Sequence, residues 1–183
     1  MFKKILVANR GEIAVRIIRA CKELNIKTVA IHSNVDTEAM HVKLADESIC
    51  VGSALPNESY LNIPSIISAI EITGADAVHP GYGFLSENDK FAKILSSHKV
   101  KFIGPTSKSI LELGNKSNAL KLASDFKLPI LGNKNSKNID NTSDAQKISK
   151  EIGMPVVIKA AYGGGGKGMR VFKNSSEIDK FFS

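Results

Sequence analysis

The sequence predicts an α/β fold in which helices cover both faces of a doubly wound, mostly parallel, Rossmann-like β-sheet. Two observations lead to this expectation. Short apolar runs of strand length alternate with segments whose apolar residues recur at helical spacing. Turns that contain glycine or proline, such as 9–11 and 80–83, close several of the apolar runs. With 183 residues, 43% of them hydrophobic, the chain has the length of one domain and part of a second.

The expected elements follow one another regularly in the first part of the chain. One helix has signals at both ends, because Asn62 can cap it before Pro64 and Gly74 lies just beyond its last turn. Strands that alternate with helices in this way pair in parallel. The predicted strands are 5–8, 28–32, 48–51, 76–79 and 100–103, and the predicted helices are 12–24, 37–45, the segment between Asn62 and Gly74, and one capped by Ser86.

The organisation changes after residue 103. Two helices are expected in succession, at 106–113 and 117–126, and segment 132–142 is rich in Asn, Lys and Ser, as a linker at a domain seam would be. We therefore expect three parts: a first domain at 1–113, a helical connector at 114–131 and an incomplete second subdomain at 132–183. The elements expected in the last part are a helix at 143–152, strands at 155–160 and 169–172, and a helix at 176–182.

Composition narrows the classes of partner. The net charge of +7 favours anionic partners. No compact basic run is interleaved with aromatic residues and Trp is absent, which argues against nucleic acid. No apolar stretch approaches the ~20 residues that span a membrane. Cys21 and Cys50 form no metal-site pattern, and we expect both to be buried, reduced thiols of a cytoplasmic protein.

A run of four glycines stands between the last two predicted strands: Gly163, Gly164, Gly165 and Gly166. Glycine accepts positive φ and leaves successive N–H groups free to surround phosphate oxygens. The run is not a Walker A loop, because Lys167 is followed by Gly168 and no helix begins there. A phosphate-covering loop for ATP is the expected function, and a plain flexible hairpin is the alternative.

Two lysines accompany this loop as candidate phosphate ligands. Lys159 lies inside an apolar strand, and a buried lysine is costly unless an anion pairs with it. A triphosphate would be such a partner, so we expect Lys159 to be buried and to bind phosphate. The alternative is a side chain that points to solvent. Lys116 lies between two predicted helices, where the residues alone favour a solvated lysine over a phosphate ligand.

The segment 79–84 (HPGYGF) follows a predicted strand on the side where ligands bind to such sheets. Gly81 and Gly83 flank Tyr82, so its ring either meets a ligand or fills a tight turn as a core aromatic. The sequence leaves both open. His79 is expected to be a hydrogen-bonded structural residue rather than a base.

The first strand and helix carry two further features. The turn 9–12 retains only Gly11 of the Rossmann glycine fingerprint, so a dinucleotide site is not supported. Arg16, Arg19 and Glu23 form a charged stripe on the helix. Spacing alone favours a solvated face, and a subunit interface is the alternative.

Four segments in chain order resemble the biotin carboxylase family: 5–14 (ILVANRGEIA), 79–88 (HPGYGFLSEN), 102–105 (FIGP), and 159–161 (KAA) with the glycine loop. The resemblance covers the whole chain. Segments 45–48 (ADES) and 59–64 (SYLNIP) look closest to the subunit of bacterial acetyl-CoA carboxylase, which serves fatty acid synthesis. Propionyl-CoA and pyruvate carboxylases share much of the pattern.

The resemblance implies an ATP-grasp ligase, with a pre-ATP-grasp domain followed by the start of an ATP-grasp lid. Such an enzyme converts ATP and bicarbonate to carboxyphosphate and transfers CO₂ to N1′ of biotin on a biotin carboxyl carrier protein. Mg²⁺ (or Mn²⁺) clamps the phosphates. Carboxyltransferase subunits and a homodimer complete the implied assembly.

Site residues carry over by motif. The resemblance assigns ATP binding to Lys116, Lys159, Met169 and the lid glycines Gly163, Gly164, Gly165 and Gly166. It assigns the edge of the biotin pocket to Tyr82 and Gly83, and the dimer surface to Arg16, Arg19 and Glu23. The family's enzyme is much longer than this chain, so no catalytic or metal-ligating residue is expected within it. We expect the chain to be inactive alone and the lid to be open and mobile without ATP.

Two departures from the family pattern stand out. Lys167 replaces a usual Arg, which keeps the charge and loses the bidentate fork, and Asn115 replaces a usual Asp. Both are expected to be tolerated. Two alternatives stay open: a non-catalytic nucleotide-binding or interaction module, and another ATP-grasp ligase such as a carbamoyl-phosphate or purine-pathway enzyme. The 79–88 motif argues against the second.

Overall fold

The computed structural model describes residues 1–130, 139, 141–159 and 168–182. The chain forms two compact units, Met1–Leu111 and Glu112–Ser183. The finer division into 1–113, 114–131 and 132–183 stays a prediction.

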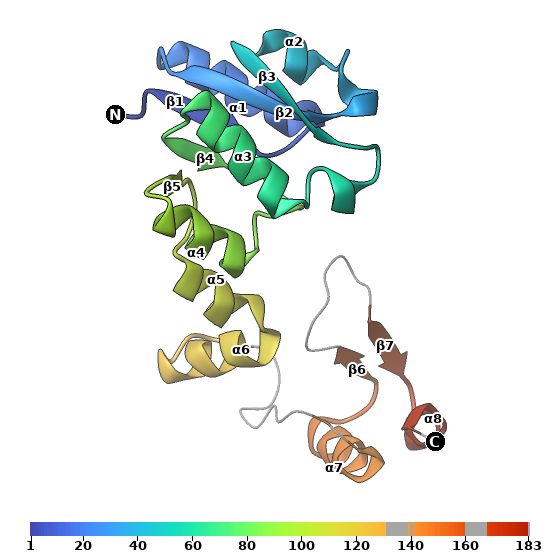
Figure 1. The fold of residues 1–183 in the computed structure, drawn as a ribbon. Coiled ribbons are helices and arrows are strands. Elements are labelled where there is room, and N and C mark those ends of the chain that lie inside the picture. The colour runs from blue at the N-terminus through green and yellow to red at the C-terminus, as the bar shows by residue number, and fades with distance from the viewer. Residues whose placement is uncertain (131–138, 140, 160–167, 183) are drawn as a thin grey trace. The chain divides into compact units, whose positions relative to one another are not determined.

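A five-stranded parallel sheet forms the centre of the first unit (Figure 1). The strand order β3-β2-β1-β4-β5 confirms the predicted doubly wound sheet. Its strands are β1 (Lys4–Val7), β2 (Lys27–Ser33), β3 (Glu47–Gly52), β4 (Ala77–His79) and β5 (Lys101–Phe102). Its helices are α1 (Gly11–Glu23), α2 (Met40–Leu44), α3 (Ile63–Thr73) and α4 (Asp89–Ser97), with short 3-10 turns η1 (Asn34–Asp36) and η2 (Pro56–Glu58).

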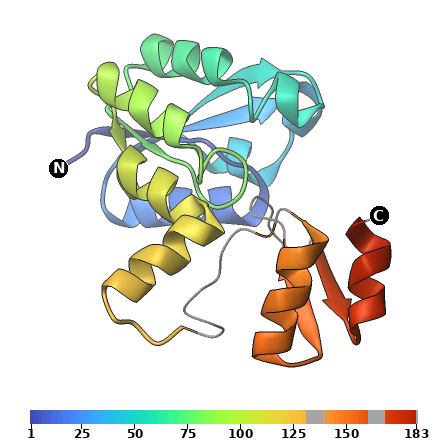
Figure 2. The ribbon, with the colours of Figure 1, turned by 90° about the horizontal axis from the view of Figure 1, so that it is seen from below.

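Strand β1 shows why the apolar runs are continuous. Leu6 packs into the core that α3 and α4 cover, whereas Ile5 and Val7 pack into the core that α1 covers. Figure 2 shows α3 and α4 on one side of the sheet and α1 on the other. Because both faces are covered, successive side chains of a central strand are all buried, and the polar alternation of a half-exposed strand is absent from β1.

The predicted capping residues are confirmed for α3 and differ for α4. The side chain of Asn62 accepts a hydrogen bond from the N–H of Ser65, and Gly74 ends α3 at φ +64°. The prediction that Ser86 caps the next helix is wrong. Asn88 is the cap and accepts from the N–H of Phe91, while the N–H of Ser86 donates to the carbonyl of Gly83 within the preceding turn.

Two other expectations change at the margins of the sheet. The helix predicted at 37–45 is the shorter α2, and β5 has only 2 residues. Cys21 and Cys50 are both free thiols, but only Cys21 is buried. The expected burial is wrong for Cys50, because β3 is an edge strand and half of its residues stay exposed.

The second unit is built around a small antiparallel sheet of β6 (Val156–Lys159) and β7 (Met169–Phe172). Helices α7 (Thr142–Ile152) and α8 (Ser175–Phe182) cover one face of it, where Ala145, Phe172 and Ile178 are almost fully buried. Helix α5 (Ser107–Gly114) crosses the boundary between the units, and α6 (Lys116–Asp125) follows it.

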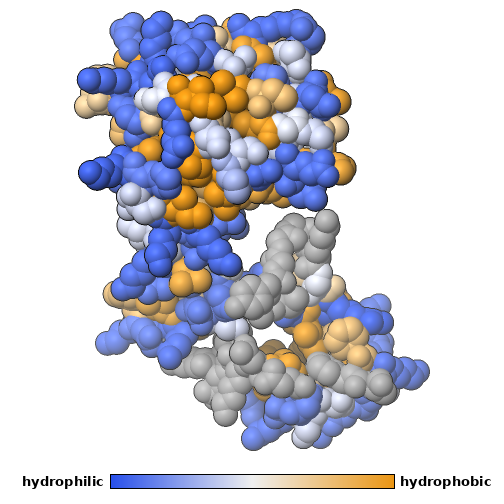
Figure 3. Space-filling view, in the orientation of Figure 1, coloured by the Kyte–Doolittle hydropathy of each residue, from blue (hydrophilic) through white to orange (hydrophobic). Residues whose placement is uncertain are grey.

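Helix α3 is apolar on more than its buried side. Ile66 and Ile70 face the sheet, whereas Ile72 is 74% exposed. Apolar side chains gather over this helix in Figure 3.

Within the described ranges, no helix combines the length and the apolar character that a membrane span requires.

Candidate functional site

The carboxyl edge of the parallel sheet brings two loops together. Strands β1 and β4 are neighbours, with Leu6 opposite Val78. The helix after β1 covers one face of the sheet and the helix after β4 covers the other. The two loops, 8–10 and 80–83, therefore flank the switch point where ligands bind in open α/β sheets.

Asn9 joins these two loops. Its side chain is almost fully buried, and its Nδ2 donates to the carbonyl oxygens of Pro80 and Tyr82, both at 2.8 Å. Its Oδ1 accepts from the N–H of Arg10 at 2.9 Å. A Cβ on Gly81 would lie 2.7 Å from Asn9 Nδ2, and Gly81 has φ +64°, so this close approach requires glycine.

Tyr82 and Gly83 lie at the exposed end of the second loop. The Tyr82 side chain is 58% exposed, and its hydroxyl donates to the carboxylate of Glu12 in the first turn of α1. The reading of Tyr82 as a core aromatic is therefore wrong. Phe84 takes the inner position, where its ring stacks on that of Tyr60 at 5.2 Å.

A buried carboxylate lies beside the first loop. Asp36 accepts from the hydroxyls of Tyr60 and Ser33 at 2.6 and 2.9 Å and from the Arg10 guanidinium at 2.6 Å. Burial acts to raise the pKa of Asp36, but these hydrogen bonds and the Arg10 charge outweigh it and hold the pKa below its usual range. Burial and the bond to Asp36 raise the pKa of Tyr60 to about 12.

Asp36 follows the second strand, where dinucleotide-binding folds place an acid for the ribose. Here both of its oxygens are taken by the protein's own groups. The sequence reading missed both Asp36 and Asn9. The available signal was a polar residue at the carboxyl end of each of two buried strands, which is where a satisfied polar network is expected.

Two histidines near this edge are held neutral. Burial lowers the pKa of His79 and of His41. His79 Nδ1 accepts from the N–H of Gly81 at 3.0 Å, which makes it the structural residue that the sequence predicts. His41 Nε2 donates to the Ile31 carbonyl at 3.3 Å, and its buried Nδ1 has no hydrogen-bond partner in the described part of the chain.

Because of these two histidines, we expect the free energy of unfolding to fall as the pH drops from 7.5 to 5.5. Their folded pKa values lie below the unfolded value of about 6.5, so the unfolded chain binds more protons below that pH. Each such proton changes stability by at most about 1.4 kcal/mol per pH unit. Urea unfolding at several pH values measures the slope. His41→Gln should reduce it and His98→Gln, at an exposed site, should not; equal slopes in all three proteins would refute the assignment.

The second unit presents an exposed apolar sheet face. Val157, Val171 and Met169 are each about half exposed, and Lys159 lies directly across the strand pair from Met169. The expectation that Lys159 is buried is wrong, because its side chain is exposed. Only one face of this two-stranded sheet packs on helices, so alternate residues of an apolar run point outward.

The glycine run Gly163, Gly164, Gly165 and Gly166, with Lys167, lies outside the described residues. The predictions of a phosphate-covering loop and of an open lid fall on this segment.

Lys116 is the first residue of α6 and is exposed. The residue before it, Asn115, caps the helix: its Oδ1 accepts from the N–H groups of Ser117 and Asn118 at 2.9 and 3.1 Å. Asn and Asp are about equally good N-caps. The departure from the usual Asp therefore leaves this helix end intact.

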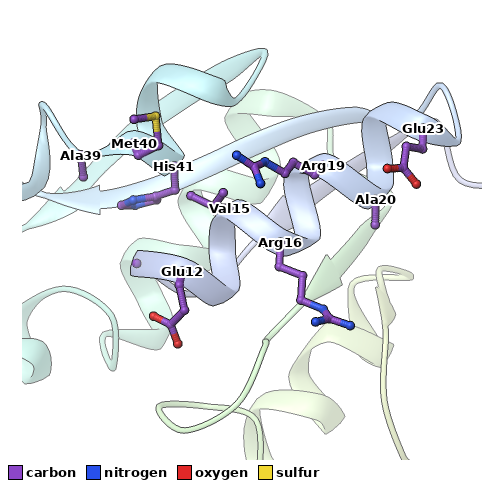
Figure 4. Close-up of a pocket in the computed structure, with 10 residues that line it drawn as sticks. Glu12, Val15, Arg16, Arg19, Ala20, Glu23, Ala39, Met40 and His41 are labelled. Carbon is purple, nitrogen blue, oxygen red and sulfur yellow. The ribbon is translucent and has the colours of Figure 1, made fainter.

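An open groove of about 790 Å³ lies between α1 and α2 (Figure 4). Arg16, Arg19 and Glu23 are exposed and line it, as does Met40, which is also exposed. In Figure 4 the Arg19 side chain extends toward α2, whereas the Arg16 side chain points away from α2. Charges of both signs around apolar side chains suit a protein surface as partner.

Within the described residues, no group of three or more His, Cys, Asp or Glu side chains could hold a metal ion.

Two families match this chain. "Biotin carboxylase, N-terminal domain" matches residues 1–110, and "Carbamoyl-phosphate synthase L chain, ATP binding domain" matches residues 115–183. Biotin carboxylase of Pseudomonas aeruginosa is 51% identical over 180 residues, which are 98% of this chain and 40% of that protein. The mitochondrial propionyl-CoA carboxylase alpha chain of Caenorhabditis briggsae is 53% identical over 176 residues, 96% of this chain and 24% of that protein.

Solved structures agree with these relatives. A biotin carboxylase–β,γ-ATP complex from Campylobacter jejuni has a TM-score of 0.94 at 46% identity, covering 98% of this chain and 40% of that one. The biotin carboxylase domain dimer of Hydrogenobacter thermophilus 2-oxoglutarate carboxylase, with MgADP, ADP and bicarbonate, has a TM-score of 0.93 at 44% identity, covering 99% and 40%.

The chain thus has a parallel-sheet domain followed by an ATP-binding domain, which is the architecture of ATP-grasp carboxylases. The chain belongs to the biotin carboxylase family. It spans about 40% of the length of the biotin carboxylases that it matches.

Proposed function

We propose that the protein containing this chain uses ATP and bicarbonate to carboxylate biotin on a biotin carboxyl carrier protein. Bicarbonate takes the γ-phosphoryl group of ATP to give carboxyphosphate and ADP. Carboxyphosphate then releases CO₂ and phosphate, and N1′ of biotin loses its proton as it takes up the CO₂. The observation that carries the proposal is the match to both domains in the expected order.

The exposed face of the β6–β7 sheet supports an ATP site. An adenine ring needs apolar surface, which Val157, Val171 and Met169 offer, and phosphates need cations, which Lys159 supplies from the same face. Lys116 adds a charge at the amino end of α6, where the helix dipole also favours anions. In this proposal Gly163, Gly164, Gly165 and Gly166 form the lid of the ATP-grasp subdomain at 132–183, which the connector at 114–131 joins to the first domain, 1–113. Magnesium, or manganese, would neutralise the phosphates when bound.

Tyr82 and Gly83 are proposed as the edge of the biotin pocket. They lie beside the switch point of the sheet, and the Tyr82 ring is exposed to an incoming ligand while Glu12 holds its hydroxyl. The groove lined by Arg16, Arg19 and Glu23 is proposed as the homodimer surface.

The proposed setting is the first half-reaction of a cytoplasmic acetyl-CoA carboxylase in fatty acid synthesis, with carboxyltransferase subunits as partners. Propionyl-CoA, pyruvate and 2-oxoglutarate carboxylases are the alternatives, because their relatives match as well. Incorporation of labelled bicarbonate by the assembled enzyme, offered each acceptor in turn, identifies the substrate. Preference for an acceptor other than acetyl-CoA would overturn the assignment to fatty acid synthesis.

Replacing Lys159 by Gln is expected to raise the KM for ATP by about tenfold or more, since a charge-assisted contact to phosphate contributes about 1.5–3 kcal/mol. The measurement is bicarbonate- and biotin-dependent ATP hydrolysis by the full-length protein. Lys150→Gln is the matched control, because Lys150 is an exposed lysine of α7 in the same unit. Equal KM values for the two variants would contradict the ATP site, and a wild-type protein without biotin-dependent turnover would contradict the function.

A further inference from the structure

We infer that Asn9 and Glu12 are positioning residues that together fix Tyr82, one at its backbone and the other at its hydroxyl. The inference rests on the proposed function in one respect, that biotin is accepted beside Tyr82. The segment from the end of β1 to the first turn of α1 would then set the affinity for biotin without contacting biotin itself.

The Asn9 amide is committed to the loop that carries Tyr82. Both Nδ2 protons are used, because Nδ2 lies 2.8 Å from the carbonyl oxygens of Pro80 and of Tyr82. The third bond, from the N–H of Arg10 to Oδ1, fixes which end of the amide faces the loop. A carboxylate in the same place has no proton to donate and would repel both carbonyl oxygens.

The geometry leaves the loop little freedom to adapt. Gly81 is pressed against the Asn9 amide, and Gly81 and Gly83 both have φ near +65°. The N–H of Gly81 is itself held by His79 Nδ1. Asn9 thus fixes the carbonyls of residues 80 and 82, and His79 fixes the amide of residue 81.

Glu12 completes the arrangement at the far end of Tyr82. The ring is 58% exposed, so packing alone does not fix its direction. The hydrogen bond from the Tyr82 hydroxyl to the Glu12 carboxylate supplies that restraint. Because Asn9 and Glu12 are separated by less than one helical turn of sequence, one short segment holds both ends of the residue.

Asn9→Asp in the full-length protein is the first test. The KM for free biotin should rise by about tenfold or more, because an unpaired buried carbonyl moves the loop. The KM for ATP in the same bicarbonate- and biotin-dependent assay should stay within about twofold. Asn34→Asp is the matched control, since it adds the same charge at an exposed residue after β2. An equal rise in the KM for biotin and the KM for ATP would show a merely structural role and overturn the inference.

The hydroxyl contact has its own pair of variants. Glu12→Gln keeps an oxygen that can accept from Tyr82 and should preserve the KM for biotin, whereas Glu12→Ala should raise it severalfold. Equal effects of the two would remove Glu12 from the proposal.

Hydrogen exchange separates the inference from the proposed function. The Gly81 amide should exchange faster in Asn9→Asp than in wild type, with no substrate present. If Asn9→Asp fails to fold, Asn9→Ser, which keeps one donor, should give an intermediate exchange rate and an intermediate KM. An unchanged exchange rate at Gly81 refutes the proposed positioning by Asn9. A changed exchange rate in a protein without biotin-dependent turnover supports that positioning and refutes only the biotin function.

Discussion

Gly52→Ala is expected to destabilise the first unit by about 3 kcal/mol. A Cβ at this position would lie 1.8 Å from the carbonyl oxygen of Glu58, and Gly52 has φ +151°. The oxygen belongs to the η2 turn, where the N–H of Glu58 bonds to the carbonyl of Leu55, so it cannot simply move aside. Urea unfolding followed by far-ultraviolet circular dichroism measures the loss, since the chain has no Trp for fluorescence.

Gly74→Ala is the matched control for this substitution. Gly74 also has positive φ, at +64°, but nothing lies within 4 Å of a Cβ built there. It should therefore lose only the conformational part, about 1 kcal/mol. The midpoint of Gly52→Ala should fall by more than about 1 M urea relative to wild type. Equal midpoints for the two variants would mean that the η2 turn yields to the methyl group.

Gly52 also illustrates where the sequence was and was not informative. The alternation of apolar runs and helices predicts the parallel sheet, because that pattern depends only on residues close in sequence. The register of β3 does not follow from it: His32 pairs with Cys50 and Ser33 with Gly52, so the ladder skips Val51. Such a bulge is a property of the pairing between β3 and β2, and the pattern of residues within either strand does not encode it.

The prediction that Lys159 is buried was wrong for a related reason. A continuous apolar run predicts a strand covered on both faces, as β1 is, but β6 belongs to a two-stranded sheet with helices on one face only. Sequence identifies the apolar residues and cannot say how many layers cover them. The resemblance to biotin carboxylase nevertheless assigned ATP binding to Lys159 and Met169, and the strand pairing places these two residues opposite one another.

The residues that the sequence missed are those whose partners lie far along the chain. Asn9 bonds to residues 71 and 73 positions away, and Asp36 bonds to Arg10 and Tyr60, which lie 26 and 24 positions away on either side. Each is a single polar residue beside an apolar strand. Only the assembled sheet brings its partners within reach.

Asp36→Ala is expected to cost about 3 kcal/mol, because three donors lose a common acceptor. The hydroxyls of Tyr60 and Ser33 are buried, and each unsatisfied buried hydroxyl costs about 1–3 kcal/mol. The Arg10 guanidinium is partly exposed, so water replaces its lost partner at smaller cost. Urea unfolding of the variant and of wild type at neutral pH gives the difference.

Glu38→Ala provides the comparison, because Glu38 also pairs with a cation at 2.9 Å but its side chain is 85% exposed. An exposed pair contributes about 0–1 kcal/mol, so this variant should unfold close to wild type. Asp36→Asn should fall between the two: its oxygen can still accept from a hydroxyl, while its amide faces the Arg10 guanidinium. If Asp36→Ala were as stable as Glu38→Ala, the buried bonds would contribute no more than a surface ion pair. Asp36 could then be assigned no structural role, and the loop at Arg10 would have to be held by Asn9 alone.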